Sequence, residues 1–266
     1  MPNQNDKTDC SILISSCDLY ADLWTPYFKQ FWKNWPDCPY PVYLSANLKT
    51  FDDPRVTTLK AGAESNWTNQ VRQHLELLET PYVLMSLEDF FLRRPVPTAK
   101  VQECLRILTE LGGHTLRLVC RPGPNQPVPG HPSIGSIECG APYRVSTQAA
   151  VWNRQSLLRL MRSDESIWEF EIKGSERSRA FETGFYGVRR DVLPYRHHVI
   201  ERGKWFPWEA RTFGRFDIGC DFDARPIMTT REAARWCASM SRATVLNAIP
   251  WRLRLRLVAA VKSIMR

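Results

Sequence analysis

Short apolar runs alternate with longer amphipathic stretches in the first third of the chain. The runs at residues 11–15, 40–45 and 82–85 are rich in strand-forming side chains and too short for helices, so they predict buried strands. Between them, apolar positions recur at helical spacing over residues 19–35 and 67–79. Strands that alternate with helices favour parallel pairing through right-handed crossovers. The pattern therefore predicts an α/β fold.

The later sequence continues this alternation less regularly. Further strands are predicted at residues 56–59, 114–120 and 143–152, and further helices at residues 98–111, after Asn153 and at residues 230–242. The predicted helix N-caps are Ser65 or Asn66, Thr98 and Asn153. Residues 121–136 contain five prolines and three glycines, which indicates a long loop that is either a lid or a disordered connector.

The composition is that of an ordinary globular protein. The 266 residues, 43% hydrophobic and 24% charged, suffice for one large α/β domain or two small ones. A formal net charge of +8 suggests an anionic partner, but no nucleic-acid-binding module is recognised, so we expect no nucleic acid. Eight scattered cysteines without a CxxC pair, a polar start and the lack of a long apolar run predict a cytoplasmic protein.

Two adjacent carboxylates stand where the strand at residues 82–85 should end. Ser86 opens a polar break, and Glu88 and Asp89 follow it. Unpaired burial of such groups is costly, so they must face water, a metal or a cationic ligand. The carboxyl ends of strands bind ligands in open α/β sheets, and Mg²⁺ or Mn²⁺ shares carboxylates with substrate phosphates. The pair is either a metal and diphosphate site or two acids that cap the next turn.

Three other acids have two possible roles each. Asp18 follows the first strand, where it is either the N-cap of the next helix or a ligand contact. Glu169 and Glu171 lie on either side of Phe170 and follow Trp168. Carboxylates beside large aromatic rings can acquire a raised pKa that suits a general base. Alternatively, these two glutamates decorate a helix N-terminus, where the helix dipole favours acids.

The last third of the chain offers weaker candidates. Asp221 and Asp223 form a literal DxD, a rival metal site, but in a loop bounded by glycine and proline. His197 and His198 are adjacent, which argues against a shared metal because neighbours in a strand point to opposite faces. Residues 251–266 read as a basic amphipathic helix, which lies either on an anionic membrane surface or against the domain.

Four stretches in order resemble bacterial glycosyltransferase-like proteins of the GT-A class, of the type found among surface-polysaccharide and lipopolysaccharide biosynthesis genes. They are ISSCDLYADLW with YPVYL, SNWTNQVRQHL, YVLMSLEDFFL, and VSTQAAVWNRQSLL followed by WEFE, with a weaker echo in ERGKW. The resemblance implies a GT-A-like, Rossmann-like, mostly parallel sheet flanked by helices. It also implies a nucleotide-sugar-binding catalytic domain at residues 1–225 and a basic helical extension at residues 226–266.

The resemblance further implies roles for individual residues. Those that would bind the nucleotide-sugar are Ser16, Asp18, Trp67, Glu88 and Asp89. Asp89 and Glu88 would hold a divalent metal, Mn²⁺ or Mg²⁺, although the acid two residues before Asp89 in a strict DxD motif is replaced by Leu87. Glu169 or Glu171 would be the catalytic base. Nearby Lys173, Arg177 and Arg179 either face the diphosphate or form a solvated helix face.

The expected function is therefore glycosyl transfer from a nucleotide-sugar to a glycan or lipid-linked acceptor in surface-polysaccharide biosynthesis. Residues 251–266 would give a peripheral contact with the inner face of the membrane. The alternative is a non-catalytic member of a biosynthetic complex that binds a nucleotide or a glycan.

Overall fold

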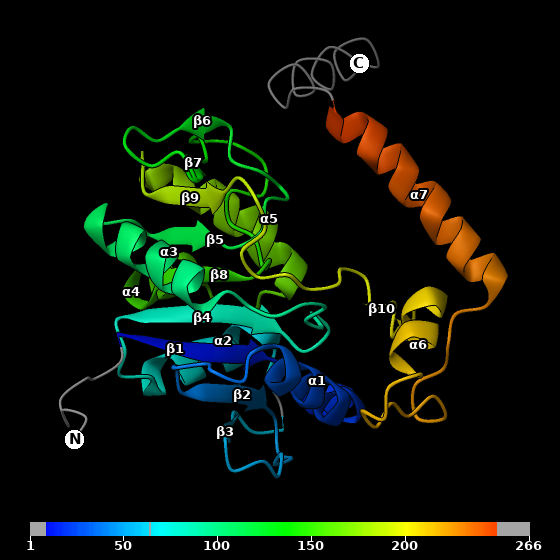
Figure 1. Cartoon of the computed structure of the whole chain (residues 1–266). Helices are drawn as coiled ribbons and strands as arrows, with labels where there is room; N and C mark the ends of the chain where they lie inside the picture. Colours follow the sequence, from blue (N-terminus) through cyan, green and yellow to red (C-terminus); the bar gives the residue numbers. More distant parts are fainter. Residues whose placement is uncertain (1–8, 64, 249–266) are drawn as a thin grey trace. The chain divides into compact units, whose positions relative to one another are not determined.

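The computed structural model of the chain describes residues 9–63 and 65–248 (Figure 1). The chain forms two compact units. The first comprises Met1–His198 with Ile218–Cys220, and the second comprises Val199–Asp217 with Asp221–Arg266. The predicted boundary between residues 225 and 226 falls inside the second unit. The assignment of catalysis to residues 1–225 and of a basic helical extension to residues 226–266 stays a prediction. The predicted helix at residues 251–266 lies outside the described residues.

The first unit is built on a nine-stranded sheet. Its strands are β1 (Cys10–Ser15), β2 (Val42–Ala46), β3 (Val56–Lys60), β4 (Tyr82–Leu87), β5 (Thr115–Arg117), β6 (Gln126–Pro127), β7 (Ile134–Ser136), β8 (Ala150–Asn153) and β9 (Phe185–Val188). Their order is β3-β2-β1-β4-β8-β5-β9-β7-β6. All strands of this sheet except β7 and β8 run in the same direction. The predicted α/β class with a mostly parallel sheet is thus confirmed.

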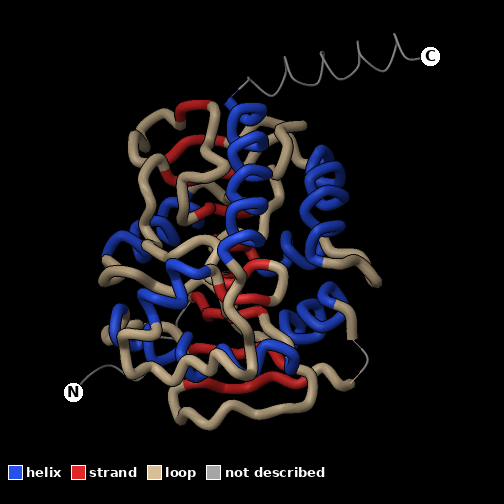
Figure 2. The backbone as a smooth tube through the Cα atoms, turned by 90° about the vertical axis from the view of Figure 1, so that its right-hand side faces the viewer, coloured by secondary structure: helices blue, strands red, loops and turns tan. Residues whose placement is uncertain are grey.

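Helices cover both faces of this sheet (Figure 2). They are α1 (Ala21–Asn34), α2 (Trp67–Leu77), α3 (Thr98–Glu110), α4 (Arg154–Leu160) and α5 (Ile167–Arg177). The chain winds outward from β1 to β3 and then returns past β1 to β4, which places α2 on the face opposite α1 because crossovers are right-handed. On its face α2 packs against α4 and α5. Every residue of β1 is buried, as expected for a strand covered on both sides.

Two predicted strands are shorter than the sequence pattern indicated. The strand predicted at residues 114–120 spans Thr115–Arg117, and the one predicted at residues 143–152 is β8, Ala150–Asn153. Backbone groups before β8 bond to side chains of α5 instead of a neighbouring strand: the Val145 amide donates to Ser175 Oγ at 3.1 Å. Residues 121–136, predicted to be a lid or a connector, contain strands β6 and β7.

The predicted helix caps are confirmed at two positions and wrong at a third. The side chains of Asn66 and Asn153 accept hydrogen bonds from the amides of Asn69 and Ser156, which caps α2 and α4. At α3 the N-cap position is Pro97. Thr98 does not cap this helix because its hydroxyl donates to Asp37 Oδ2 at 2.7 Å and accepts from Trp35 Nε1 at 2.9 Å.

The second unit is small and built around aromatic side chains. It contains a hairpin of β10 (Ile200–Glu201) and β11 (Lys204–Trp205), followed by α6 (Pro207–Phe213) and α7 (Thr230–Ala248). Phe206, Met228 and Ala233 form its core, with Trp236 and Cys237 packed against them. The helix predicted at residues 230–242 is therefore present and extends to Ala248.

Candidate functional site

The winding of the sheet reverses between β1 and β4, and the two strands end together. They pair in parallel, with Ile14 beside Ser86 and Ser15 beside Leu87. The segments that follow, residues 16–18 and 88–89, therefore leave neighbouring strands at the same edge, which we call the carboxyl edge. In open α/β sheets the crevice for ligands forms at this kind of reversal. The structure thus brings together two of the predicted groups of site residues.

The acidic pair lies at this edge in a partly buried setting. Glu88 is 8% exposed. Burial raises the pKa of the Cys17 thiol, and the charge of Glu88 raises it further, so Glu88 lies within electrostatic range of the end of β1. Burial also raises the pKa of Tyr27, whose hydroxyl bonds to Ser86, with smaller contributions from Glu88 and Asp89. Both carboxylates therefore act on the groups where β1 and β4 end.

Asp18 does not cap α1, whose N-cap is Tyr20. Its carboxylate instead accepts the backbone amides of Asn47, Leu48 and Lys49, at 3.0 to 3.2 Å. Partial burial opposes ionisation, but these amide donors outweigh it and hold the pKa of Asp18 below its usual value. Asp18 thus fixes the loop that follows β2 at the carboxyl edge.

A polar network continues from this loop into the sheet. Asn47 donates to Gln70 Oε1 at 3.2 Å, and Gln70 Nε2 donates to the Ser16 carbonyl at 2.6 Å and to Ser45 Oγ at 2.7 Å. Ser45 Oγ also lies 2.8 Å from Nδ1 of His74, which is fully buried. Burial lowers the pKa of His74 to about 4, so its ring is neutral at pH 7. The network fixes the ends of β1 and β2 with uncharged donors and acceptors.

Ser16 and Trp67, both predicted to bind nucleotide, lie at the same edge. Ser16 Oγ accepts a hydrogen bond from Trp24 Nε1 at 2.8 Å. Trp67 Nε1 donates to Ser15 Oγ at 2.9 Å, and its ring lies 5.3 Å from that of Phe170. The two tryptophans come from α1 and α2, on opposite faces of the sheet, and each bonds to a serine hydroxyl at the end of β1.

Tyr195 and Gln148 flank the acidic pair on the side of β8. Phe90, directly after Asp89, stacks on Tyr195 with ring centroids 4.3 Å apart. The Tyr195 hydroxyl donates to Gln148 Oε1 at 2.7 Å. Burial raises the pKa of Tyr195, and the nearby charge of Asp89 contributes to that rise. Because β8 is antiparallel to β4, its first residue Ala150 lies beside Met85, so Gln148 emerges at the carboxyl edge.

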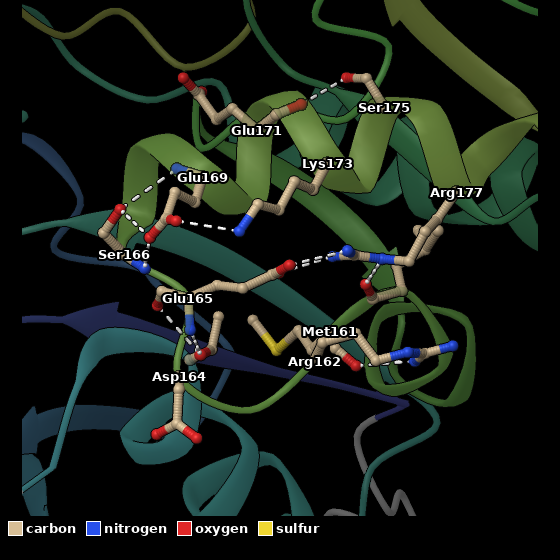
Figure 3. Close-up of polar contacts among 12 residues, drawn as sticks. Met161, Arg162, Asp164, Glu165, Ser166, Glu169, Glu171, Lys173, Ser175 and Arg177 are labelled. Carbon is tan, nitrogen blue, oxygen red and sulfur yellow. Dashed lines mark hydrogen bonds and ion pairs between the residues drawn. The ribbon is translucent and has the colours of Figure 1, made fainter.

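The expected raised pKa is wrong for Glu169. This residue forms a capping box with Ser166 at the start of α5 and accepts a hydrogen bond from Lys173 Nζ at 2.9 Å (Figure 3). These interactions lower its pKa to about 2, with the Ser166 amide as the main cause and Lys173 next. Trp168 cannot bury the carboxylate because it is itself 72% exposed. Glu169 thus has the helix-terminal role that the sequence left as its alternative.

Glu171 points to the other side of α5 from Glu169, since two residues turn a helix by about 200° (Figure 3). It is 7% exposed. Its Oε1 accepts from the Thr147 amide at 2.7 Å, from Thr147 Oγ1 at 2.9 Å and from Ser146 Oγ at 3.2 Å. These residues lead directly into Gln148 and β8. Glu171 therefore holds the segment that reaches the carboxyl edge beside the acidic pair.

The remaining charged candidates are engaged elsewhere. Arg177 forms a bidentate pair with Glu165 at 2.8 and 2.6 Å, and Lys173 pairs with Glu169, so both stabilise α5 and its approach (Figure 3). Asp221 accepts the amides of Asp223 and Ala224, which makes its DxD a turn. In the described part of the chain no group of three or more histidine, cysteine, aspartate or glutamate side chains could hold a metal ion.

Glu88 and Asp89 still suit one kind of cation. Mg²⁺ and Mn²⁺ are often held by one or two protein carboxylates, with phosphate oxygens and water completing the coordination. A pair of carboxylates at the end of a strand matches that donor set.

Among the described residues, no helix is long and apolar enough to cross a membrane.

Sequence reasoning missed Asn47, Gln70, Gln148 and Tyr195. Asn47 could have been found, because it is the first polar residue after the strand at residues 40–45 and so stands where Asp18 and Glu88 stand on their own strands. Gln70 and Gln148 carry no such signal, since their relevance depends on contacts with residues far along the chain.

The fold matches solved structures at low identity. A mannosyltransferase from Pyrobaculum calidifontis, described in complex with GDP-Man and Mn²⁺, matches with 12% identity and a TM-score of 0.50, covering 77% of this chain and 60% of that one. TarS from S. aureus in complex with UDP matches with 11% identity and a TM-score of 0.49, covering 71% and 59%. The bifunctional IspDF from Campylobacter jejuni matches with 11% identity and a TM-score of 0.40, covering 70% and 52%.

No family model and no curated protein matches the chain. The chain spans between 52% and 60% of the length of these three solved structures. At such identities the likeness concerns the fold alone. The chain has a GT-A-like α/β fold, as its sequence predicted.

Proposed function

We propose that this protein is a glycosyltransferase that uses a nucleotide-sugar donor. The observation that carries the proposal is the position of Glu88 and Asp89 at the carboxyl edge, where the winding of a GT-A-like sheet reverses between β1 and β4. The mannosyltransferase of similar fold is described with GDP-Man and Mn²⁺, which supports the same class of ligand here.

The two sides of the carboxyl edge suit the two parts of such a donor. The ends of β1 and β2 present the uncharged network of Asn47 and Gln70, with Trp67 beside it, which suits a nucleoside. Asp18 supports this side by ordering the loop after β2, and Ser16 by its carbonyl contact with Gln70. The end of β4 presents the acidic pair, which suits the diphosphate with a bound cation.

Glu88 and Asp89 would hold that cation, Mn²⁺ or Mg²⁺, with Asp89 as the principal ligand. When bound, the cation would neutralise charge on the departing nucleoside diphosphate. The chain's own groups at the edge position the donor. On the β8 side of the acidic pair, Tyr195 bonds to Gln148 and stacks on Phe90, which would help to hold the carboxylates in place before a ligand binds.

Of the two glutamates predicted as catalytic base, Glu171 is the one we propose. It braces the segment that enters the carboxyl edge, whereas Glu169 is committed to its capping box and to Lys173. A carboxylate near the acceptor hydroxyl can take its proton during transfer.

The proposal also covers the acceptor and the place in the cell where transfer occurs. By the resemblance of the sequence, the acceptor would be a glycan or a lipid-linked sugar in surface-polysaccharide biosynthesis, at the cytoplasmic face of the membrane. The basic residues of 251–266 would supply a peripheral membrane contact.

The test is a thermal shift of the full chain against nucleoside diphosphates and nucleotide-sugars, with and without Mn²⁺. A ligand at 100 times its Kd stabilises the folded state by about 2.7 kcal/mol, which corresponds to a rise in Tm of about 5 °C or more. We expect this shift with one nucleotide family and Mn²⁺. Asp89→Asn should abolish the metal-dependent part and the transferase activity while leaving the Tm of the free protein nearly unchanged.

The matched control is Asp9→Asn, because Asp9 is an exposed acid at the other end of β1. This variant should bind and react like the natural protein. A metal-responsive, active Asp89→Asn variant would eliminate the acidic pair as the site. Binding without turnover of any donor would instead support the non-catalytic alternative, and no shift with any nucleotide would refute the donor site itself.

A further inference from the structure

Three segments leave the sheet at the carboxyl edge, on the side of the acidic pair away from β1, and run side by side. They are residues 90–93 after β4, residues 118–121 after β5 and residues 189–197 after β9. Leu92 forms an antiparallel bridge with Tyr195, and the Val192 amide donates to the Leu118 carbonyl at 2.9 Å. All of these residues belong to the first unit. Side chains that follow three different strands can therefore meet at this part of the edge.

Each segment contributes one nitrogen-bearing side chain to a group that we call the basic cluster, Arg93, Arg121 and His197. The two arginines are exposed, and His197 is half-buried. The centroid of the His197 ring lies 4.7 Å from that of Tyr195 and 6.4 Å from that of Phe90, which directly follows the acidic pair. The basic cluster thus lies beside the proposed reaction centre.

The electrostatics of His197 place the two arginines together. Burial lowers the pKa of His197, and neighbouring positive charges lower it further, so the ring is neutral at pH 7. The positive charges are those of His198, Arg121 and Arg93, and the opposing negative charge is that of Asp191. Both guanidinium groups therefore lie within electrostatic range of the same ring.

Asp191, the acid beside the basic cluster, is committed to the loop after β5. Its Oδ1 accepts the Cys120 amide at 2.9 Å. Desolvation opposes ionisation of Asp191, but the amide and thiol of Cys120, with the charges of His197 and Arg93, hold its pKa below the usual value. Its single negative charge balances one of the two arginines, which leaves one positive charge for a ligand.

We propose that the basic cluster binds a phosphate group carried by the acceptor sugar. Guanidinium groups bind phosphate oxygens through paired hydrogen bonds, and a neutral histidine ring still offers one N–H donor. The inference rests on the proposed transferase function and narrows its acceptor to a phosphorylated sugar, either free in solution or linked to a lipid through phosphate.

The position of the basic cluster favours the acceptor over the donor. The proposed donor occupies the ends of β1, β2 and β4, which leaves the side of β5 and β9 for the acceptor. Arg93 is four residues after Asp89, and four residues span at most about 14 Å. A phosphate on the basic cluster is therefore within reach of a sugar whose hydroxyl reacts at the acidic pair.

The first experiment is a titration of the full chain with glucose 1-phosphate, and separately with glucose, without nucleotide or metal. We expect the phosphate ester to bind and to shift the NMR signals of the His197 ring, identified with His197→Gln, and glucose to shift nothing. Arg93→Gln/Arg121→Gln should weaken this binding at least about tenfold. The thermal shift with nucleotide and Mn²⁺ should stay unchanged in that variant.

The matched control is Arg106→Gln/Arg159→Gln, which removes two exposed arginines from α3 and α4. It should bind glucose 1-phosphate like the natural protein, and circular dichroism should show every variant folded. An equal loss in the control would reduce the effect to net charge and overturn the proposal. Competition between the nucleoside diphosphate and glucose 1-phosphate would assign the basic cluster to the donor instead, and would overturn it as well.

The second experiment compares acceptors in the transferase assay. A sugar phosphate in solution, a short-chain prenyl diphosphate sugar in detergent and their unphosphorylated counterparts are the probes, and turnover of either phosphorylated probe identifies the source. Arg93→Gln/Arg121→Gln should raise the KM for that acceptor about tenfold. Equal KM values with and without phosphate would overturn the inference. A nucleotide thermal shift without phosphate binding would also overturn it while the transferase proposal stands, whereas phosphate binding without any nucleotide shift would refute the transferase alone.

Discussion

At the scale of single residues, the acids of this protein differ by what donates to them. Asp18 accepts three backbone amides about thirty residues away, Glu169 caps its own helix, and Glu171 braces Thr147. The sequence could locate these carboxylates at the ends of strands and near a helix start. It could not assign their partners, because the donors come from segments that only the folded chain brings close.

The proposed base can be separated from the helix cap by kinetics. Glu171→Gln should lower kcat by roughly 10² to 10⁴ with little change in nucleotide affinity, because the amide keeps its shape but cannot take a proton. Glu169→Gln is the matched variant on the opposite side of the same helix and should retain kcat. Steady-state kinetics of both variants would decide the assignment. Equal activity in the two would remove Glu171 from the reaction.

His74 makes a second residue-scale prediction, on the pH dependence of stability. Its folded pKa of about 4 lies below the unfolded value near 6.5, so the unfolded state binds the proton more readily. The contribution of neutral His74 to the free energy of unfolding is complete above pH 6.5 and is lost as the pH falls toward 4. Over this range the free energy of unfolding changes by at most about 1.4 kcal/mol per pH unit because of His74.

Urea unfolding of the natural protein and of His74→Gln at pH 7, 6 and 5 would measure this effect. The free energy of unfolding of the natural protein should fall more steeply over this range than that of the variant. Parallel curves would show that His74 is not held neutral inside the sheet network.

At the scale of elements, the sequence predicted those features that depend on residues close together in the chain, such as helix caps. The predicted caps were Ser65 or Asn66 for one helix and Asn153 for another, each from a polar residue before apolar periodicity, and Asn66 and Asn153 cap their helices. The SIWE pattern at residues 166–169 carries the signature of a capping box and would have identified the role of Glu169. The short strands beyond β4 were harder, because their limits depend on long-range contacts such as that of Val145 with Ser175.

The start of α5 supplies a prediction at this scale. Ser166→Ala removes the hydroxyl that accepts the Glu169 amide, although the backbone amide of residue 166 can still donate to the Glu169 carboxylate, and should lower the free energy of unfolding by about 1 kcal/mol. Ser163→Ala, an exposed serine of the preceding loop, should cost little. Urea titration of both variants would test this, and equal midpoints would show that the capping box does not stabilise α5.

At the scale of the whole molecule, the α/β class was predictable but the strand order was not. The βα alternation of the first ninety residues indicates parallel strands, and their reversal at β4 follows the usual winding. The antiparallel β8 enters between β4 and β5 only because residues separated by about seventy positions pair, as Tyr82 does with Asn153. A pairing of that kind leaves no local trace in the sequence.

The ends of this sheet have a consequence for how the protein behaves in crowded solution. The outermost strand on one side, β6, is two residues long and includes Pro127, which has no amide hydrogen to offer. On the other side, β3 places Thr57 and Lys60 in solvent, and a lysine on an outer strand discourages a second chain from joining. A broad sheet built this way resists growth by edge-to-edge addition, which protects the folded protein from aggregation at high concentration.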